Sequence, residues 1–82
     1  MCLAVPALVI SVTDPSRALA LSDSGGIRRE IDLSCVLGEG PPEMLVGRWV
    51  LVHVGVALAL ISDEEARASL ALWAELDDGE RQ

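Results

Sequence analysis

Three side chains in this sequence carry a thiol or an imidazole, groups that bind metals such as iron, copper and zinc: Cys2, Cys35 and His53. Cys2 directly follows Met1, and its small side chain permits removal of Met1, which would leave an amine and a thiol on one terminal residue. A thiolate at an exposed chain end stays reactive and is a soft ligand suited to iron, copper or zinc. Cys2 is therefore the first candidate metal ligand, although its position alone leaves open that it has no role.

The other two residues carry weaker signals. His53 lies within the apolar run from Trp49 to Ile61. There it could ligate a metal, or it could be a core histidine whose ring nitrogens bond to the backbone. Cys35 is expected to be a buried small hydrophobe without a chemical role. A thiol redox protein stays open as an alternative, and it would need a cysteine such as Cys35 to resolve an oxidised Cys2.

The remaining composition argues against most catalytic sites. With one His and two Cys, the chain falls one ligand short of a closed zinc site with four Cys or His ligands. No acidic residue neighbours His53 in the sequence, so a Ser–His–acid triad has no support. The pair Gly25-Gly26 lacks the spacing of a phosphate-binding loop. We therefore expect a protein that is not an enzyme.

The charge balance narrows the range of partners. The formal charge is −7, from 13 acidic residues against 6 basic ones. Nucleic acids and anionic membranes attract basic proteins, so we expect neither as a partner. The longest apolar run is shorter than the ~20 residues that span a bilayer, and Pro6 interrupts the opening apolar stretch, unlike in a secretory signal. These features predict a cytoplasmic protein with reduced thiols.

The pattern of turns and apolar residues predicts a mainly β fold. The 82 residues suffice for a single domain, 1–82, with one apolar core. Asp14-Pro15-Ser16 predicts a turn, Asp23-Ser24-Gly25-Gly26 predicts a hairpin, and Gly55 permits a bend or bulge. Residues 38–42 are expected to be the least structured part. The predicted strands are 3–13, 18–22, 27–33, 49–54 and 56–61, which suggests a small five-stranded barrel over about residues 1–61.

The last part of the chain predicts one α-helix, over about residues 63–78. Ser62-Asp63-Glu64-Glu65 matches a capping box, in which Ser62 bonds the amide of Glu65 and Glu65 bonds the amide of Ser62. The apolar residues that follow have a helical period and form a broad apolar arc. Gly79 is expected to end the helix.

Two segments resemble the signatures of a known family. The opening Met1-Cys2-Leu3-Ala4-Val5-Pro6 resembles the N-terminal signature of the HypC/HupF family. Residues 47–57 resemble its second motif, a Gly-x-aromatic-Val-Leu-Val-His-Val-Gly run, and the acidic helix start is also similar. The chain departs from the family where a Gly and then a basic residue usually follow the opening Pro, because it has Ala7 and Leu8 there. It also has Arg48 and Val56 where the family often has an acidic residue and Phe, which indicates a specialised paralogue.

The resemblance implies an OB-like β-barrel with one C-terminal α-helix, and a chaperone role in the maturation of nickel–iron hydrogenase. The cargo would be iron that bears cyanide and carbon monoxide, assembled with the help of HypE and shared transiently with a partner. Cys2 would be the metal ligand and docking thiol, and His53 a nearby ligand or orienting group. The implied partners are HypD, a larger iron–sulfur maturation protein, and the precursor of the hydrogenase large subunit. They would dock on Met1, Cys2, Leu3, Ala4, Val5 and Pro6.

A rival prediction comes from a different class of protein. A small protein-interaction module without a metal role would bind a partner through the barrel face or the apolar face of the helix. In that case Cys2→Ala would leave partner binding intact, whereas a carrier would lose its function.

Overall fold

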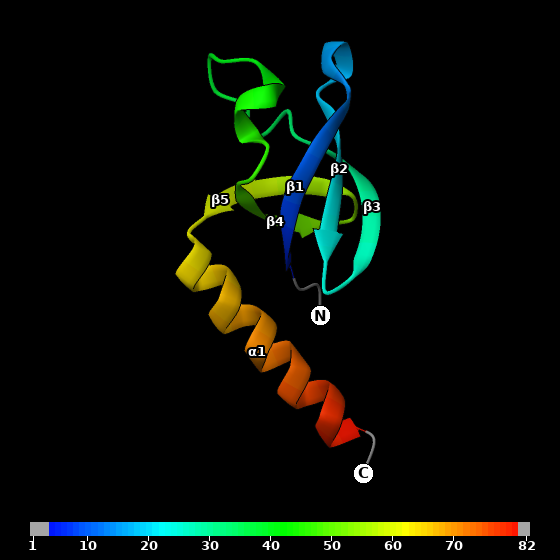
Figure 1. Cartoon of the computed structure of the whole chain (residues 1–82), viewed down its shortest axis with the longest axis vertical. Helices are drawn as coiled ribbons and strands as arrows, with labels where there is room; N and C mark the ends of the chain where they lie inside the picture. The colour runs from blue at the N-terminus through cyan, green and yellow to red at the C-terminus, as the bar shows by residue number, and fades with distance from the viewer. Residues whose placement is uncertain (1–3, 81–82) are drawn as a thin grey trace.

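A computed structural model describes residues 4–80, with the side chains described as far as Leu72. It has five strands that close into a barrel in the order β1-β2-β3-β5-β4, followed by one helix (Figure 1). The predicted five-stranded barrel with a C-terminal helix is therefore confirmed. The strands are β1 (Val5–Asp14), β2 (Leu19–Ser24), β3 (Ile27–Asp32), β4 (Trp49–His53) and β5 (Val56–Ile61), and the helix is α1 (Asp63–Glu80).

Short polar segments make the first two turns, as predicted. The carboxylate of Asp14 accepts hydrogen bonds from the backbone N–H groups of Ser16 and Arg17, at 3.1 and 3.3 Å, and so caps a 3-10 turn, η1 (Pro15–Arg17). Gly25 and Gly26 both have positive φ, 60° and 91°, between the antiparallel strands β2 and β3. Glycine adopts this conformation without steric cost, which is why a two-residue hairpin forms here.

The long connection between β3 and β4 contains an element that was not predicted from the sequence. Residues 38–41 have no regular secondary structure, but a second 3-10 helix, η2 (Pro42–Leu45), begins at Pro42. Its Pro42 and Leu45 are buried. The predicted unstructured segment is thus one residue too long, because Pro42 begins a turn that carries Leu45 into the core.

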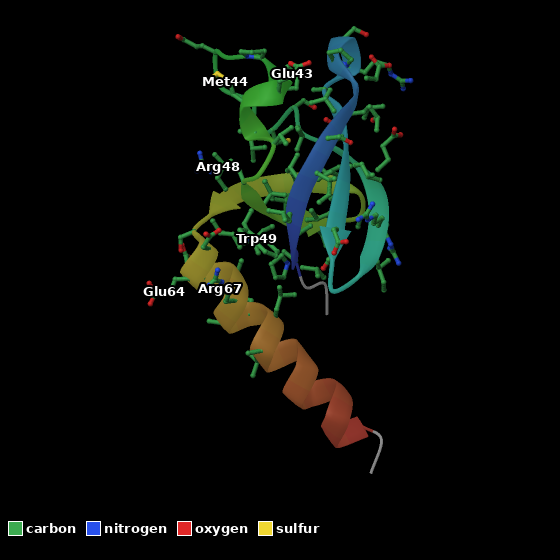
Figure 2. The ribbon with its side chains drawn as sticks, in the orientation of Figure 1. Glu43, Met44, Arg48, Trp49, Glu64 and Arg67 are labelled. Carbon is green, nitrogen blue, oxygen red and sulfur yellow. The ribbon has the colours of Figure 1, made fainter. Side chains whose placement is uncertain are left out.

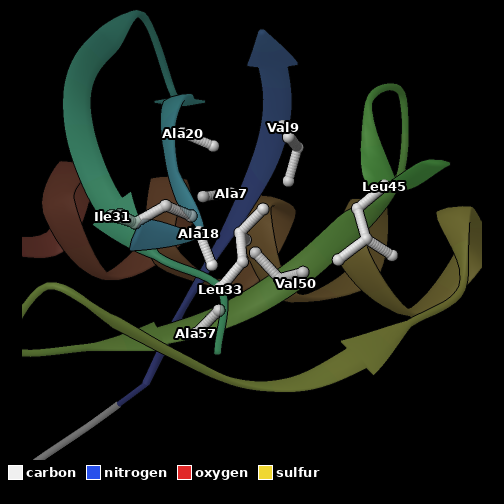
Figure 3. Close-up of a cluster of buried hydrophobic side chains, with 9 residues drawn as sticks. All are labelled: Ala7, Val9, Ala18, Ala20, Ile31, Leu33, Leu45, Val50 and Ala57. Atoms are coloured by element: carbon white, nitrogen blue, oxygen red, sulfur yellow. The ribbon is translucent and has the colours of Figure 1, made fainter. Parts of the chain in front are cut away.

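The core is built from small aliphatic side chains, because the chain has no Phe or Tyr. Figure 3 shows the buried cluster: Ala7, Val9, Ala18, Ala20, Ile31, Leu33, Leu45, Val50 and Ala57. One buried polar side chain, Ser22, lies beside these residues, and its hydroxyl donates to the carbonyl of Arg29 at 3.0 Å. That hydrogen bond removes the penalty of burying a hydroxyl in an apolar environment.

The helix starts at the predicted capping box. The Glu65 N–H donates to the Ser62 hydroxyl oxygen at 3.1 Å, and the Ser62 N–H donates to the Glu65 carboxylate at 3.3 Å. Ala66, in the first turns, is fully buried, while the later part of α1 extends away from the barrel (Figure 1). The prediction that Gly79 ends the helix is wrong, because α1 continues to Glu80. Within residues 4–80, no helix has the length and apolar character needed to cross a membrane.

Candidate functional site

His53 lies at the end of β4, where a tight turn of Val54 and Gly55 leads into β5. His53 pairs with Val56 across this turn, so only two residues connect the strands. The φ angles of Val54 and Gly55 are 52° and 77°. The left-handed region strains a β-branched residue such as valine, and strain of this kind is common at functional sites. The Val54 side chain is 84% exposed, so its own burial does not explain the conformation.

The pairing of β1 with β4 brings the start of the described chain to His53. The two strands are antiparallel and Val5 pairs with Val52. In an antiparallel pair, one step back along β1 corresponds to one step forward along β4. If the register is continued by one step beyond Val5 and Val52, Ala4 lies beside His53. Ala4 and His53 are both half-buried. The histidine and the first described residues therefore lie at the same end of the barrel.

Side chains on these two strands alternate between the barrel interior and its outer face. Ala7, Val9 and Val50 are buried inside. Pro6 points to the opposite side and is also buried, since α1 packs on β1 and β4. Pro6 pairs with Leu51, and the alternation places His53 on the same outer face as Leu51. The face of the sheet that carries His53 is thus the one against which α1 begins.

A cavity of about 380 Å³ opens inside the same end of the barrel. Its apolar walls come from three strands and the strained turn, and include Val5, Ile31, Val52 and Val54. Ser24 lies at its edge and donates a hydrogen bond to the carbonyl of Pro6 at 2.7 Å, which ties the start of β1 to the β2–β3 hairpin. The start of β1 is therefore held between this hairpin and α1.

The predicted site residues fall into two groups. Met1, Cys2 and Leu3 lie outside the described residues. Ala4 and Val5 are half-buried and Pro6 is buried. That these residues contact a partner, and that Cys2 and His53 bind metal, stay predictions. Among residues 4–72, whose side chains the structure describes, no group of three or more His, Cys, Asp or Glu side chains could hold a metal ion.

Cys35 differs from its prediction. It was expected to be buried, but its thiol is free and exposed. It lies two residues after the buried Leu33, in a turn beyond the end of β3. The turn begins where the Asp32 carboxylate accepts hydrogen bonds from both the side chain and the backbone N–H of Ser34. Both hydrogen bonds lower the pKa of Asp32 below its ordinary value, and the bond from the Ser34 side chain has the larger effect.

The strain at Val54 was not predicted from the sequence. Gly55 was expected to permit a bend or bulge, whereas it forms the second half of a two-residue turn. The register shift of this strand pair lies instead between Leu51 and Val52. A Gly between two apolar strands is a signal for such a turn. Val54, the residue before Gly55, did not indicate the turn, because Asn or Asp is usual at that position.

The geometry describes a small five-stranded barrel in which the start of β1, His53 and the strained turn lie at one end. Comparison with known proteins agrees with this class. The model of the HupF/HypC family matches residues 1–73, and the chain belongs to this family.

Three relatives show how far the similarity extends. The chain is 45% identical to hydrogenase maturation factor HypC of Rhodobacter capsulatus, over 100% of this chain and 82% of that protein. It is 39% identical to hydrogenase maturation factor HybG of Escherichia coli strain K12, over 94% of this chain and 93% of that protein. It is also 39% identical to hydrogenase maturation factor HypC of a Synechocystis species, over 93% of this chain and 97% of that protein.

Proposed function

We propose that this chain is a hydrogenase maturation chaperone that carries iron bearing cyanide and carbon monoxide ligands. Membership of the HupF/HypC family and relatives named as hydrogenase maturation factors support this role. The chain receives the iron on a HypD-type maturation protein and delivers it to the precursor of the hydrogenase large subunit. The cytoplasm, where thiols stay reduced, suits such a carrier.

In this proposal the Cys2 thiolate and the His53 imidazole are the two ligands that the chain contributes. The observation that carries the idea is the β1–β4 register, in which Val5 pairs with Val52, so that one further step would bring Ala4 beside His53. Cys2 precedes Ala4 by two residues, and two extended residues span at most about 7 Å. Chain connectivity alone therefore keeps the Cys2 backbone within reach of the barrel end that carries His53.

Two ligands also explain why the iron is carried rather than stored. Low-spin iron takes six ligands, and the diatomic groups occupy only part of that shell. A thiolate and an imidazole leave the shell incomplete, so the partner completes it and the metal passes on when the partner changes. The hydrogen bond from Ser24 and the packing of α1 hold the start of β1 in place. The residues that precede β1 and include Cys2 are therefore attached to a fixed part of the barrel.

The experiment compares hydrogenase maturation in cells that produce variants of this chain in place of the wild type. Cys2→Ala should abolish maturation and the iron content of the complex with HypD. Cys35→Ser is the matched control, because it removes the other thiol, which is free and exposed, and it should mature hydrogenase normally. If Cys2→Ala matured hydrogenase fully, the carrier role would be rejected. The alternative, a protein-interaction module without a metal role, would then be favoured.

A further inference from the structure

One edge of β5 lacks a strand partner. On one side β5 pairs with β4 from Val56 to Ile61, except at Leu58. On the other side it meets β3 at a single bridge between Asp32 and Val56, beside a 2.9 Å hydrogen bond from the Asp32 N–H to the Gly55 carbonyl. Within residues 4–80, no backbone hydrogen bond joins residues 57–61 to an element other than β4. The barrel therefore closes at one point and leaves the rest of this edge open.

This edge also lacks two of the features that protect an open strand, namely charged side chains and prolines. Natural edge strands carry charges or prolines that prevent pairing with other chains. β5 is VALALI, with neither, and the Leu58 and Leu60 side chains are 52% and 39% exposed. An uncharged six-residue segment of this kind pairs readily with other strands. A register shift between Ala57 and Ala59 leaves Leu58 without a partner on β4.

An apolar groove lies beside the open edge. Its volume is about 260 Å³ and Leu60 forms one wall. The opposite wall comes from η2 and the loop before it, and includes Leu37, Pro41 and Met44. The Met44 side chain is exposed, and a flexible thioether adapts to different apolar partners. A peptide paired with β5 would find a place here for an apolar side chain.

The charges around the groove favour a basic peptide. Glu39 and Glu43 are exposed on the loop and on η2, and Asp63 and Glu64 follow the end of β5. Figure 2 shows Glu43 and Glu64 on either side of this end of β5. Among the described residues the one ion pair joins Arg28 to Asp23, so these carboxylates have no salt-bridge partner there. Two basic side chains, Arg48 and Arg67, lie on the same side (Figure 2), against the four carboxylates of Glu39, Glu43, Asp63 and Glu64.

We propose that the edge of β5, residues 57–61, accepts an extended segment of a partner protein in which apolar side chains alternate with Arg or Lys. Backbone hydrogen bonds to the edge would hold the peptide, and the groove at Leu60 would select an apolar side chain. A second copy of this chain fits poorly, because each copy carries a formal charge of −7. The proposal goes beyond iron carriage and does not depend on it.

The test is a nuclear magnetic resonance titration of the full chain with a short synthetic peptide that alternates Val and Arg. We expect saturable shifts and slower hydrogen exchange at the amides of residues 57–61. A peptide with N-methyl groups on alternate backbone nitrogens should bind at least about tenfold more weakly, because it loses several hydrogen bonds. Replacement of its Arg residues by Glu should weaken binding by a similar factor.

Two variants of the chain localise the binding. Leu60→Lys places a positive charge in the groove and should weaken binding of the Val–Arg peptide about tenfold or more. Leu72→Lys is the matched control, because Leu72 is an exposed leucine on α1, and it should bind normally. Circular dichroism verifies that both variants keep the fold. Equal binding of the N-methylated peptide, shifts confined to other strands, or self-association of the chain through β5 would each overturn the proposal.

Discussion

The substitution Val54→Asn tests the strain in the turn beside His53. A residue other than glycine in the left-handed region costs about 1–2 kcal/mol, and Asn tolerates this region better than valine because its short side chain bonds locally. Asn followed by Gly is also the preferred pair for such a turn. The substitution loses little burial, since Val54 is 84% exposed. We expect the free energy of unfolding to rise by about 1 kcal/mol, and Tm by about 4–8 °C.

Thermal unfolding of the purified chain, followed by circular dichroism, measures this gain. Val46→Asn is the matched control, because Val46 is also an exposed valine but has an ordinary φ of −63°. The control should show no gain in Tm. If Val54→Asn raised Tm no more than Val46→Asn did, the strain argument would be refuted. Maturation assays with the same variant then report whether the conformation of the Val54 turn is needed to orient His53.

Three further predictions concern the core, the helix start and the acid stability. Leu33→Ala removes a fully buried side chain and should lower the free energy of unfolding, measured in urea, by about 2–5 kcal/mol. A loss below about 1 kcal/mol would instead show that the core collapses around the gap. Ser62→Ala should lower the free energy of unfolding by about 1 kcal/mol, because the helix loses its N-cap, and Ser62→Gly should lower it by less. An equal or larger loss in the glycine variant would contradict the N-cap role of Ser62. Hydrogen bonds from Ser16 and Ser34 lower the pKa values of Asp14 and Asp32 in the folded chain. Both carboxylates therefore stabilise the fold at pH values above their pKa in the unfolded chain. This stability is lost as the pH falls through their pKa in the folded chain. Asp32→Asn should therefore flatten the acid limb of a plot of Tm against pH, and an unchanged limb would refute that assignment.

Much of the fold follows from local signals that the sequence carries. The glycine pair at Gly25, the Asp14 cap and the Ser62 capping box each act within a few residues, so the structure confirms the elements that they delimit. The end of α1 was less predictable. A glycine stops a helix when it adopts positive φ there, and Gly79 instead continues the helix.

The features that the sequence did not reveal depend on contacts between distant segments. Whether Cys35 is buried depends on where β3 ends relative to the core, and Leu33 is the last buried residue before the exposed Ser34 and Cys35. The missing partner of β5 is likewise a property of barrel closure, because it depends on how far β3 extends beside it. For the candidate site, the resemblance named Cys2 and His53, while the structure adds the β1–β4 register that relates the start of the chain to His53.

The most direct test of the account is infrared spectroscopy of the complex purified with a HypD-type partner. The account predicts carbon monoxide and cyanide stretches in the wild-type complex. The stretches should disappear in Cys2→Ser and persist in Cys35→Ser. A shift of their frequencies in His53→Ala would identify His53 as a ligand. Undiminished stretches at unchanged frequencies in the Cys2→Ser complex would contradict the claim that this chain contributes a thiolate to the iron.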